Sequence, residues 1–252
     1  MPIVALNLLY DTTAMNNPAV WDALAAGSWK KSPEQRWFHD YVLYPAICER
    51  LPQQSRILDY GCGSGELLAV LRQYGHHVVG FDPSVGMVKR ARALNPNIRI
   101  VADHHLLGNE QFDTVLLNLV LTCVEDAVGV GSAALGYTRR LIITVPHPCF
   151  SLFSDLHTTT RRVWICNAET ADERELYLQQ PAQAVVWDDE GTTTTLYHRS
   201  ISTWFRLFQK LELYVEYLAE LVPIASGACI GELYERFSQI PAFMLFDLQR
   251  KH

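Results

Sequence analysis

The stretch Leu58-Asp59-Tyr60-Gly61-Cys62-Gly63-Ser64-Gly65 decides the fold of this chain. Its three alternate glycines follow an apolar run over residues 56–60 and precede a helical pattern over residues 66–74. Glycine at these positions permits a tight turn and a close approach of the backbone to a ligand at the N-terminus of the helix. The stretch therefore predicts a strand, a ligand-binding turn and a helix, which form the first unit of a parallel α/β sheet.

Acidic residues narrow the choice of ligand. A dinucleotide fingerprint requires its third glycine at position 66, where Glu66 stands instead. Asp59 ends the first predicted strand, where a carboxylate repels a pyrophosphate and suits an ammonium group. Asp82 follows the next predicted strand, residues 77–81. Its sequence distance from the glycine turn is typical of an acid that binds both hydroxyls of a ribose. Taken alone, these residues also fit a glycine turn without a ligand and a helix N-cap at Asp82.

The rest of the chain continues the alternation of strands and helices. Further strands are expected at residues 98–101, 112–117, 140–145, 211–218 and 243–246, which brings the total to seven. Helices are expected at residues 87–94, 202–210 and 231–237. The pattern predicts an α/β protein built around one sheet.

The composition excludes several classes of protein. The chain has 21 basic and 27 acidic side chains, and its net charge of −6 opposes binding to nucleic acid. No apolar run approaches the length of about 18 residues that a membrane span requires, and the first residues lack the basic start of a secretory signal. Six scattered cysteines and two pairs of adjacent histidines predict neither disulfides nor a metal site. We therefore expect a cytoplasmic protein whose partner is a small molecule, with a homodimer left open.

Four segments and Met87 together resemble class I S-adenosylmethionine-dependent methyltransferases. The segments are residues 56–65, 79–84, 102–104 and 112–121. They are similar to the small-molecule branch that includes quinone-biosynthesis methyltransferases. The resemblance implies S-adenosylmethionine as cofactor. It also implies a Rossmann-like sheet of seven strands, mostly parallel with an antiparallel last strand, and helices on both faces.

The resemblance also implies which residues bind the cofactor. They are Asp59, Gly61, Cys62 and Gly63 in the first motif, Asp82, Pro83 and Met87 in the second, Asp103 and His104 in the third, and Asn118 in the fourth. The tetrapeptide of amino-methyltransferases, Asp or Asn followed by Pro-Pro-aromatic, is absent, which disfavours nucleobase and amide substrates. Thr122 and Cys123 stand where many relatives carry histidine, so a base from this segment is not assumed.

A length of 252 residues fits a single domain with insertions. We expect residues 1–50 to form a helical cover, residues 51–150 the cofactor-binding core, and residues 151–200 an insertion that covers the substrate. Residues 201–252 complete the sheet. Within the insertion, residues 185–187 and 192–197 flank a turn around Asp188-Asp189-Glu190-Gly191 and predict a hairpin.

Methyl transfer depends mainly on in-line placement and exclusion of water, and it needs a base only for a hydroxyl, a thiol or an acidic carbon. His147, between two prolines after the fifth strand, and His198 are the predicted bases, with a structural role as the alternative for each. Arg199 is expected either to pair with a substrate carboxylate or to cap a loop. Tyr10 and Trp29 in the helical cover are expected to contact the substrate, with simple packing as the alternative.

Three functions are compatible with these patterns. The leading hypothesis is transfer of a methyl group from S-adenosylmethionine to O, N or C of a small aromatic or apolar acceptor. A second is a protein that binds S-adenosylmethionine for another reaction or as a structural group. A nicotinamide oxidoreductase is disfavoured by Asp59 and by the position of the third glycine.

Overall fold

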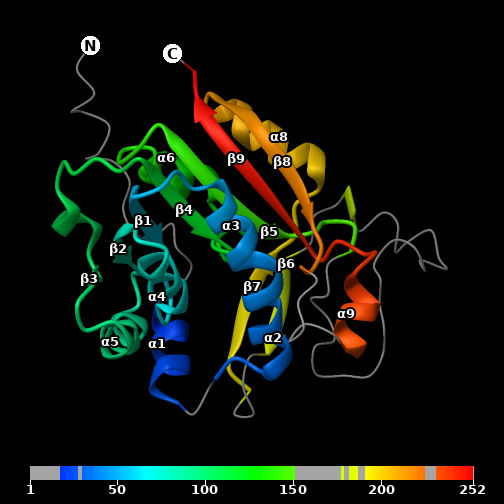
Figure 1. Ribbon diagram of the computed structural model, residues 1–252, viewed down its shortest axis with the longest axis horizontal. Helices are drawn as coiled ribbons and strands as arrows, with labels where there is room; N and C mark the ends of the chain where they lie inside the picture. Colours follow the sequence, from blue (N-terminus) through cyan, green and yellow to red (C-terminus); the bar gives the residue numbers. More distant parts are fainter. Residues whose placement is uncertain are drawn as a thin grey trace.

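The computed structural model describes residues 18–27, 30–150, 177–178, 182–186, 191–224 and 231–251. Its larger sheet has seven strands in the order β3-β2-β1-β4-β5-β9-β8 (Figure 1). The strands are β1 (Arg56–Tyr60), β2 (His77–Phe81), β3 (Arg99–Val101), β4 (Thr114–Asn118), β5 (Arg140–Pro146), β8 (Leu213–Leu221) and β9 (Phe243–Arg250). Neighbouring strands from β3 to β5 pair in parallel, whereas β9 pairs antiparallel with both β5 and β8. The predicted sheet, mostly parallel with an antiparallel last strand, is confirmed.

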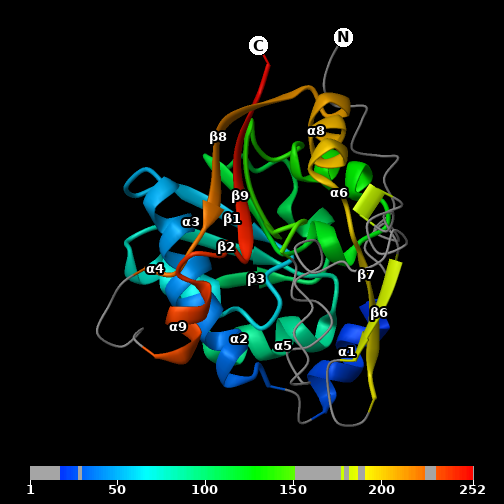
Figure 2. The same cartoon turned by 90° about the vertical axis from the view of Figure 1, so that its right-hand side faces the viewer.

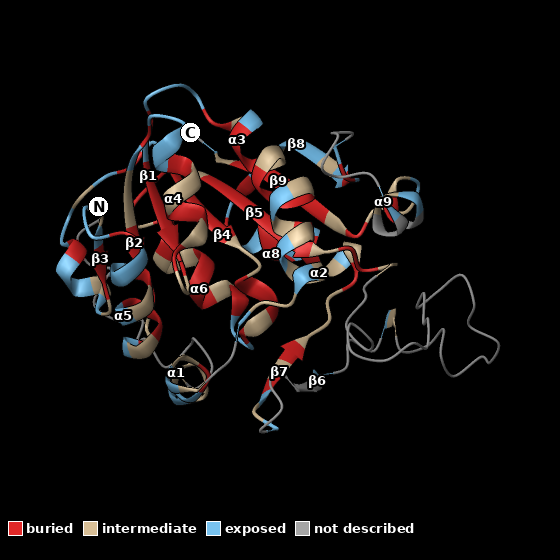
Figure 3. Ribbon diagram, turned by 60° about the horizontal axis from the view of Figure 1, so that its bottom comes forward, coloured by how far each residue is buried: buried red, intermediate tan, exposed pale blue. Residues whose placement is uncertain are grey.

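Alternate side chains of the central strands enter two separate apolar cores. In β4, Val115 and Leu117 belong to one core and Leu116 to the other. The helices that pack around the sheet are α3 (Tyr44–Arg50), α4 (Glu66–Gln73), α5 (Val85–Leu94), α6 (Ala127–Ala134) and α8 (Ile201–Lys210). Helices α6 and α8 close the first core, and α3 and α4 close the second. Because helices cover both faces, the central strands are mostly apolar and are buried except at their ends (Figure 3).

The N-terminal helix α1 (Pro18–Ala26) is held on α5 by polar contacts from its middle and its C-terminal end, and the two helices lie side by side in Figures 1 and 2. Asp22 Oδ1 accepts hydrogen bonds from Ser84 Oγ at 2.6 Å and from the Gly86 amide at 2.7 Å. The Arg90 guanidinium donates to the carbonyl oxygens of Ala25 and Gly27, each at 2.8 Å. These contacts hold the described part of the predicted helical cover against the core.

The predicted hairpin within residues 151–200 is present. Strand β6 (Ala182–Val186) pairs antiparallel with β7 (Thr193–Tyr197) in a separate two-stranded sheet. Its tip at residues 188–190 and residues 151–176 of the insertion lie outside the described residues. After β8, the predicted helical stretch forms α9 (Glu232–Phe237). No helix within the described ranges has the length and apolar character that crossing a bilayer demands.

The antiparallel strand β9 carries a buried carboxylate at Asp247. The prediction that this strand ends at residue 246 is wrong, because the strand continues through Asp247 to Arg250. Asp247 accepts hydrogen bonds from Arg140 at 2.7 and 2.9 Å and from Arg50 at 2.9 and 3.2 Å. Burial alone would raise the pKa of Asp247, but the two arginines outweigh it and lower the pKa below its usual value. Since Arg50 ends α3, this cluster ties the N-terminal helices to the sheet.

Replacing Asp247 by Asn should destabilise the protein by about 3 kcal/mol at pH 7, because two partly buried guanidinium groups lose their buried counter-charge. Because the pKa of Asp247 is lower in the folded protein than its unfolded value of about 3.9, the ionised carboxylate stabilises the fold at pH values above 3.9. This stabilisation is lost as the pH falls through the folded pKa. The loss should therefore shrink toward acid pH. Urea unfolding at pH 7 and at lower pH measures both effects. The exposed Glu216→Gln on β8 is the matched control, and equal losses in the two variants would contradict the prediction.

Candidate active site

A cavity of about 280 Å³ opens where the parallel strands end. In an α/β sheet, this is the edge at which ligands bind. Its walls come from the turn after β1, the ends of β2, β4 and β5, the N-terminal helices, and β7 and β9. The lining residues discussed below are Trp21, Lys31, Phe38, His39, Tyr44, Asp59, Gly61, Cys62, Gly63, Glu66, Asp82, Pro83, Met87, Asn118, Leu119, Val120, Thr122, Cys123, Val124, Leu196 and Phe243. Eight of the ten predicted cofactor residues are therefore brought together.

The glycine turn is held against the end of β2. The amides of Gly61 and Cys62 donate to the carbonyl oxygen of Phe81 at 2.7 and 2.9 Å. Gly61 has a φ of +90°, and a Cβ there would lie 2.5 Å from a methyl carbon of Val120, so only glycine fits. At Gly63, by contrast, no atom of the described residues, apart from its immediate chain neighbours, lies within 4 Å of the position that a Cβ would take. The turn is packed at its base and has free space for a ligand at Gly63.

Asp82 links this turn to the following helix. Its two carboxylate oxygens accept hydrogen bonds from the amides of Gly63 at 2.8 Å and Ser84 at 2.9 Å. Burial raises the pKa of Asp82 to about 6, although both amide hydrogen bonds lower it and the nearby Asp22 raises it. Each oxygen retains the capacity to accept a second hydrogen bond. The position suits a ligand with two neighbouring hydroxyl groups.

Asp59 is the clearest sign that the cavity binds a ligand. Its side chain is 2% exposed, and its Oδ1 has no hydrogen-bond partner among the described residues. Burial, followed by the charge of Asp82, raises the pKa of Asp59 to about 7. A buried acceptor without a partner is costly, so such groups in folded proteins call for an explanation. A cationic donor bound in the cavity would supply the missing partner.

The N-terminal helices supply a polar wall that the sequence did not predict. Lys31 lies 3.5 Å from Glu66, which also accepts hydrogen bonds from Ser64. His39 and Tyr44 follow on the next turns of the chain, and Trp21 of α1 also lines the cavity. No local motif marks these residues, because the tertiary packing of the cover brings them to the cavity. Tyr10 and Trp29, which were predicted to contact the substrate, lie outside the described residues.

The opposite wall is the segment after β4. Leu119 adopts a φ of +60°, a backbone conformation that is unfavourable for a leucine. Its amide donates to the carbonyl of Thr144 at 3.1 Å, while the Thr144 hydroxyl donates to Asn118 Oδ1 at 2.6 Å. A short 3-10 turn, η5 (Leu121–Cys123), continues this wall. The hydrogen bonds to β5 thus maintain the strained backbone beside the cavity.

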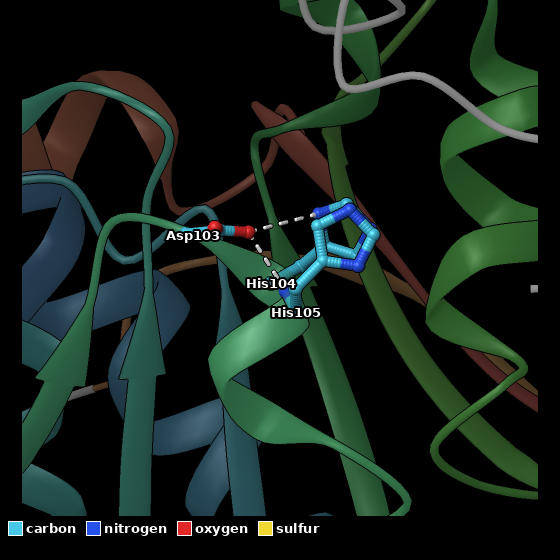
Figure 4. Close-up of side chains that lie close together, drawn as sticks. All are labelled: Asp103, His104 and His105. Carbon is cyan, nitrogen blue, oxygen red and sulfur yellow. Dashed lines mark hydrogen bonds and ion pairs between the residues drawn. The ribbon is translucent and has the colours of Figure 1, made fainter. Parts of the chain in front are cut away.

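Two predicted cofactor residues, Asp103 and His104, do not line the cavity. Asp103 is exposed and accepts a hydrogen bond from the His105 amide at 2.9 Å, which caps the turn η4 (His104–Leu107) (Figure 4). The rings of His104 and His105 are tilted, with centroids 4.0 Å apart and planes at 36°. Together with Asp103 they offer ligand atoms that lie within 4.8 Å of one another. Contact of Asp103 and His104 with an adenine ring stays a prediction.

His147 was predicted as a base beside the transferred group, and the structure does not support that role. It is almost fully buried and does not line the cavity. Its Nδ1 accepts a hydrogen bond from the Cys149 amide at 3.1 Å, so Nε2 carries the proton that it donates to Glu220 at 2.8 Å. Both ring nitrogens are engaged, one by Glu220 of β8 and the other by the Cys149 amide, whereas the preceding Pro146 lines the cavity. These contacts support the alternative prediction for His147, a structural role.

His198 and Arg199 also lie outside the cavity wall. The His198 ring packs against Tyr177, with centroids 5.5 Å apart. The Arg199 guanidinium donates to the carbonyl oxygens of Leu121 and Val124 at 2.7 Å and of Glu125 at 2.8 Å. Of the two roles predicted for Arg199, the structure supports loop capping rather than pairing with a substrate carboxylate. Arg199 thereby fixes the wall that follows β4.

Comparisons with known proteins agree with this fold. Residues 58–135 match the family model described as a methyltransferase domain. The chain is 30% identical over 122 residues to a ubiquinone biosynthesis O-methyltransferase of Xylella fastidiosa. The matched part is 44% of this chain and 50% of that protein. It is 29% identical over 130 residues to the bifunctional methionine biosynthesis protein MetXA/MetW of Rhodopirellula baltica. That match takes in 46% of this chain and 21% of the relative. The chain thus spans half or less of the length of these relatives.

Among solved structures, an S-adenosylmethionine-dependent methyltransferase from Mesorhizobium loti superposes with a TM-score of 0.63 and 24% identity. The superposition covers 82% of this chain and 96% of the other. At this identity the likeness concerns the fold alone. The predicted resemblance is confirmed for the fold: residues 58–135 match the methyltransferase domain model, and the chain has the fold of class I S-adenosylmethionine-dependent methyltransferases.

Replacing Arg199 by Ala should loosen the wall after β4. Hydrogen bonds from a charged donor contribute about 1.5–3 kcal/mol each, so amide exchange in residues 119–126 should accelerate at least about tenfold. Hydrogen–deuterium exchange by mass spectrometry measures this, with α5 as the internal reference. Arg206→Ala, which removes an exposed arginine on α8, is the control. Unchanged exchange in residues 119–126 would mean that Arg199 does not hold this wall.

Replacing Asp59 by Asn should stabilise the ligand-free protein more at pH 8 than at pH 5. With a folded pKa of about 7, Asp59 in the folded state keeps a proton that the unfolded state releases near pH 4. Stability is therefore lost as pH rises from about 4 to about 7, and the amide avoids that loss. Scanning calorimetry should show a gain of at least about 3 °C at pH 8. An equal change at both pH values, or a similar gain in Glu216→Gln, would contradict this explanation.

Proposed function

We propose that this protein transfers a methyl group from S-adenosylmethionine to a small-molecule acceptor. The observation that carries the proposal is the unpaired Asp59 carboxylate beside an open glycine turn, in a chain with the fold of this class. The predicted activity and cofactor agree with the methyltransferase domain at residues 58–135. The matched segments make up only 21% and 50% of the two relatives, so their names alone do not establish the activity of this chain. The proposal therefore rests on the residues of the cavity.

The residues of the cavity fit the cofactor group by group. Asp59 would accept from its ammonium group, and Asp82 from its two ribose hydroxyls. Lys31 provides a cation for its carboxylate, while Trp21 and Met87 offer apolar surface for its adenine ring. When bound, S-adenosylmethionine supplies an electrophilic methyl group on a positively charged sulfur. The protein's own contribution is to orient both reactants and to exclude water.

The charge of the cavity favours this cofactor over a nicotinamide dinucleotide. Asp59, Asp82 and Glu66 all line the cavity, against the single ammonium of Lys31 in the described lining. A pyrophosphate placed beside Asp59 and Asp82 would meet two carboxylates, each of which already has a raised pKa. A ligand with an ammonium and a sulfonium group relieves the same repulsion.

The acceptor is proposed to be small and aromatic or apolar, and to accept the methyl group at O, N or C. Apolar side chains make up much of the lining, among them Phe38, Val120, Val124, Leu196 and Phe243. Such a lining suits a flat apolar molecule. The name of the Xylella relative favours the quinone-biosynthesis branch, as the sequence predicted. A cytoplasmic location and a homodimer stay predictions from the sequence.

The alternative is a protein that binds S-adenosylmethionine without transferring its methyl group. Nothing in the wall around Asp59 distinguishes the two functions, because that wall binds the part of the cofactor that does not react. Mass spectrometry of the acceptor distinguishes them, since methyl transfer adds the mass of one CH₂ group.

Isothermal titration calorimetry should detect binding of S-adenosylmethionine and of its demethylated product. Asp59→Asn and Asp82→Ala should each weaken binding by about tenfold or more, because each removes a charge-assisted contact. Glu216→Gln, which removes a carboxylate far from the cavity lining, should bind normally. Binding of NADH in the absence of S-adenosylmethionine binding would overturn the proposed function.

A further inference from the structure

A π-helical turn brings His39 and Tyr44 to the same wall of the cavity. In η3 (His39–Leu43), the Tyr44 amide donates to the carbonyl of His39, five residues earlier. Pro45 explains the turn, since it has no amide hydrogen for the carbonyl of Tyr41, which accepts from the Ile224 amide at 2.9 Å instead. The rings of His39 and Tyr44 meet edge to face, with centroids 5.3 Å apart. Single π-turns are rare and often occur at functional sites.

The hydrogen bond of His39 fixes its tautomer. Its Nδ1 lies 2.6 Å from the carbonyl oxygen of Gln35, and a carbonyl can only accept, so Nδ1 carries the hydrogen. Nε2 therefore holds a lone pair, on the side of the ring that faces away from its own helix. Within the described part of the chain, this nitrogen has no hydrogen-bond partner. Burial, followed by the charge of Lys31, lowers the pKa of His39 to about 4, so the ring is neutral at neutral pH.

Tyr44 supplies the complementary donor. Its side chain is buried, it lines the cavity, and its hydroxyl has no hydrogen-bond partner among the described residues. Burial and then the carboxylates of Glu66 and Asp59 raise the pKa of Tyr44, so the hydroxyl stays protonated. The influence of these two carboxylates also means that the ring lies near the acidic end of the cavity. One element thus presents a free acceptor and a free donor side by side.

We propose that His39 and Tyr44 hold a hydroxyl group of the acceptor, which makes this protein an O-methyltransferase. The inference rests on the proposed function. A hydroxyl group can donate its hydrogen to His39 Nε2, accept a hydrogen bond from Tyr44, and keep a second lone pair for the methyl group. A neutral amine has a single lone pair, which the Tyr44 hydroxyl would occupy, and a carbon nucleophile has none to offer Tyr44. The pair therefore selects oxygen.

The transfer balances without a further reactant. The acceptor oxygen forms a bond to the methyl carbon as the carbon–sulfur bond breaks and its electron pair stays on sulfur. The hydroxyl proton moves to His39 Nε2 and from there to solvent. An alkylated hydroxyl group is a strong acid, so a weakly basic imidazole is sufficient to take the proton. His39 is accordingly a catalytic residue, and Tyr44 orients the oxygen.

Matched aromatic probes test this assignment. Catechol and 1,2-diaminobenzene share one ring shape and differ in the nucleophile, and 1,2-dimethoxybenzene lacks both donor hydrogens. The wild-type protein should methylate catechol and not the diamine, as judged by product mass. His39→Gln should lower kcat for catechol by about 10²-fold while leaving the Kd of S-adenosylmethionine unchanged. Tyr44→Phe should mainly raise the KM for catechol.

Controls separate this proposal from the one on which it rests. The exposed His77→Gln and Tyr74→Phe should leave kcat and KM for catechol unchanged. In ¹⁵N-labelled protein, the His39 ring should show the Nδ1–H tautomer, and its Nε2 signal should move with catechol but not with dimethoxybenzene. Failure to bind S-adenosylmethionine refutes the proposed function. Normal cofactor binding with no catechol methylation, equal methylation of the diamine, or full activity in His39→Gln overturns the hydroxyl site alone.

Discussion

Three backbone amides at the turn after β1 determine where the carboxylates of Asp59 and Asp82 lie in the cavity. Two of them, from Gly61 and Cys62, bind the carbonyl of Phe81, and the third, from Gly63, binds the carboxylate of Asp82. The turn is thereby tied to the end of β2, and Asp59 and Asp82 are held close together although both are buried. Glycine is required because the backbone passes through conformations with positive φ and directly under Val120.

The N-terminal helices complete a cavity that the sheet alone leaves open. Asp22 and Arg90 hold α1 on α5, while the ion pairs of Asp247 hold α3 on β9. Between these two anchors lie Lys31 and the π-turn, so the polar wall is fixed at both ends rather than free to move. This arrangement places side chains from the first 50 residues against groups at the ends of β1 and β2. The N-terminal helices therefore contribute to the site only because these long-range contacts hold them on the sheet and on α5.

The fold and the cofactor wall could be predicted from the sequence, because glycine turns and strand-ending acids are local signals. Asp59, Gly63 and Asp82 act through the backbone turn on which they stand, so neighbouring residues suffice to identify them. The wall formed by His39 and Tyr44 could not be predicted in this way, since it depends on a π-turn caused by Pro45 and on the packing of the cover. His147 misled for the opposite reason. It stands at the correct edge of the sheet, but Glu220, 73 residues away, engages it.

The two walls of the cavity make different contributions to the proposed reaction. Asp59 would bind an ammonium group that keeps its charge throughout, so it stabilises the bound reactant and the transition state equally and does not lower the barrier between them. Acceleration must therefore come from groups that act on the acceptor or on the distance between the reactants. The candidates are the π-turn and the segment after β4, where Thr144 and Arg199 hold the strained backbone at Leu119 in place. Pre-organised backbone of this kind avoids reorganisation during the reaction, which is how a rigid wall lowers a barrier that binding energy at Asp59 cannot.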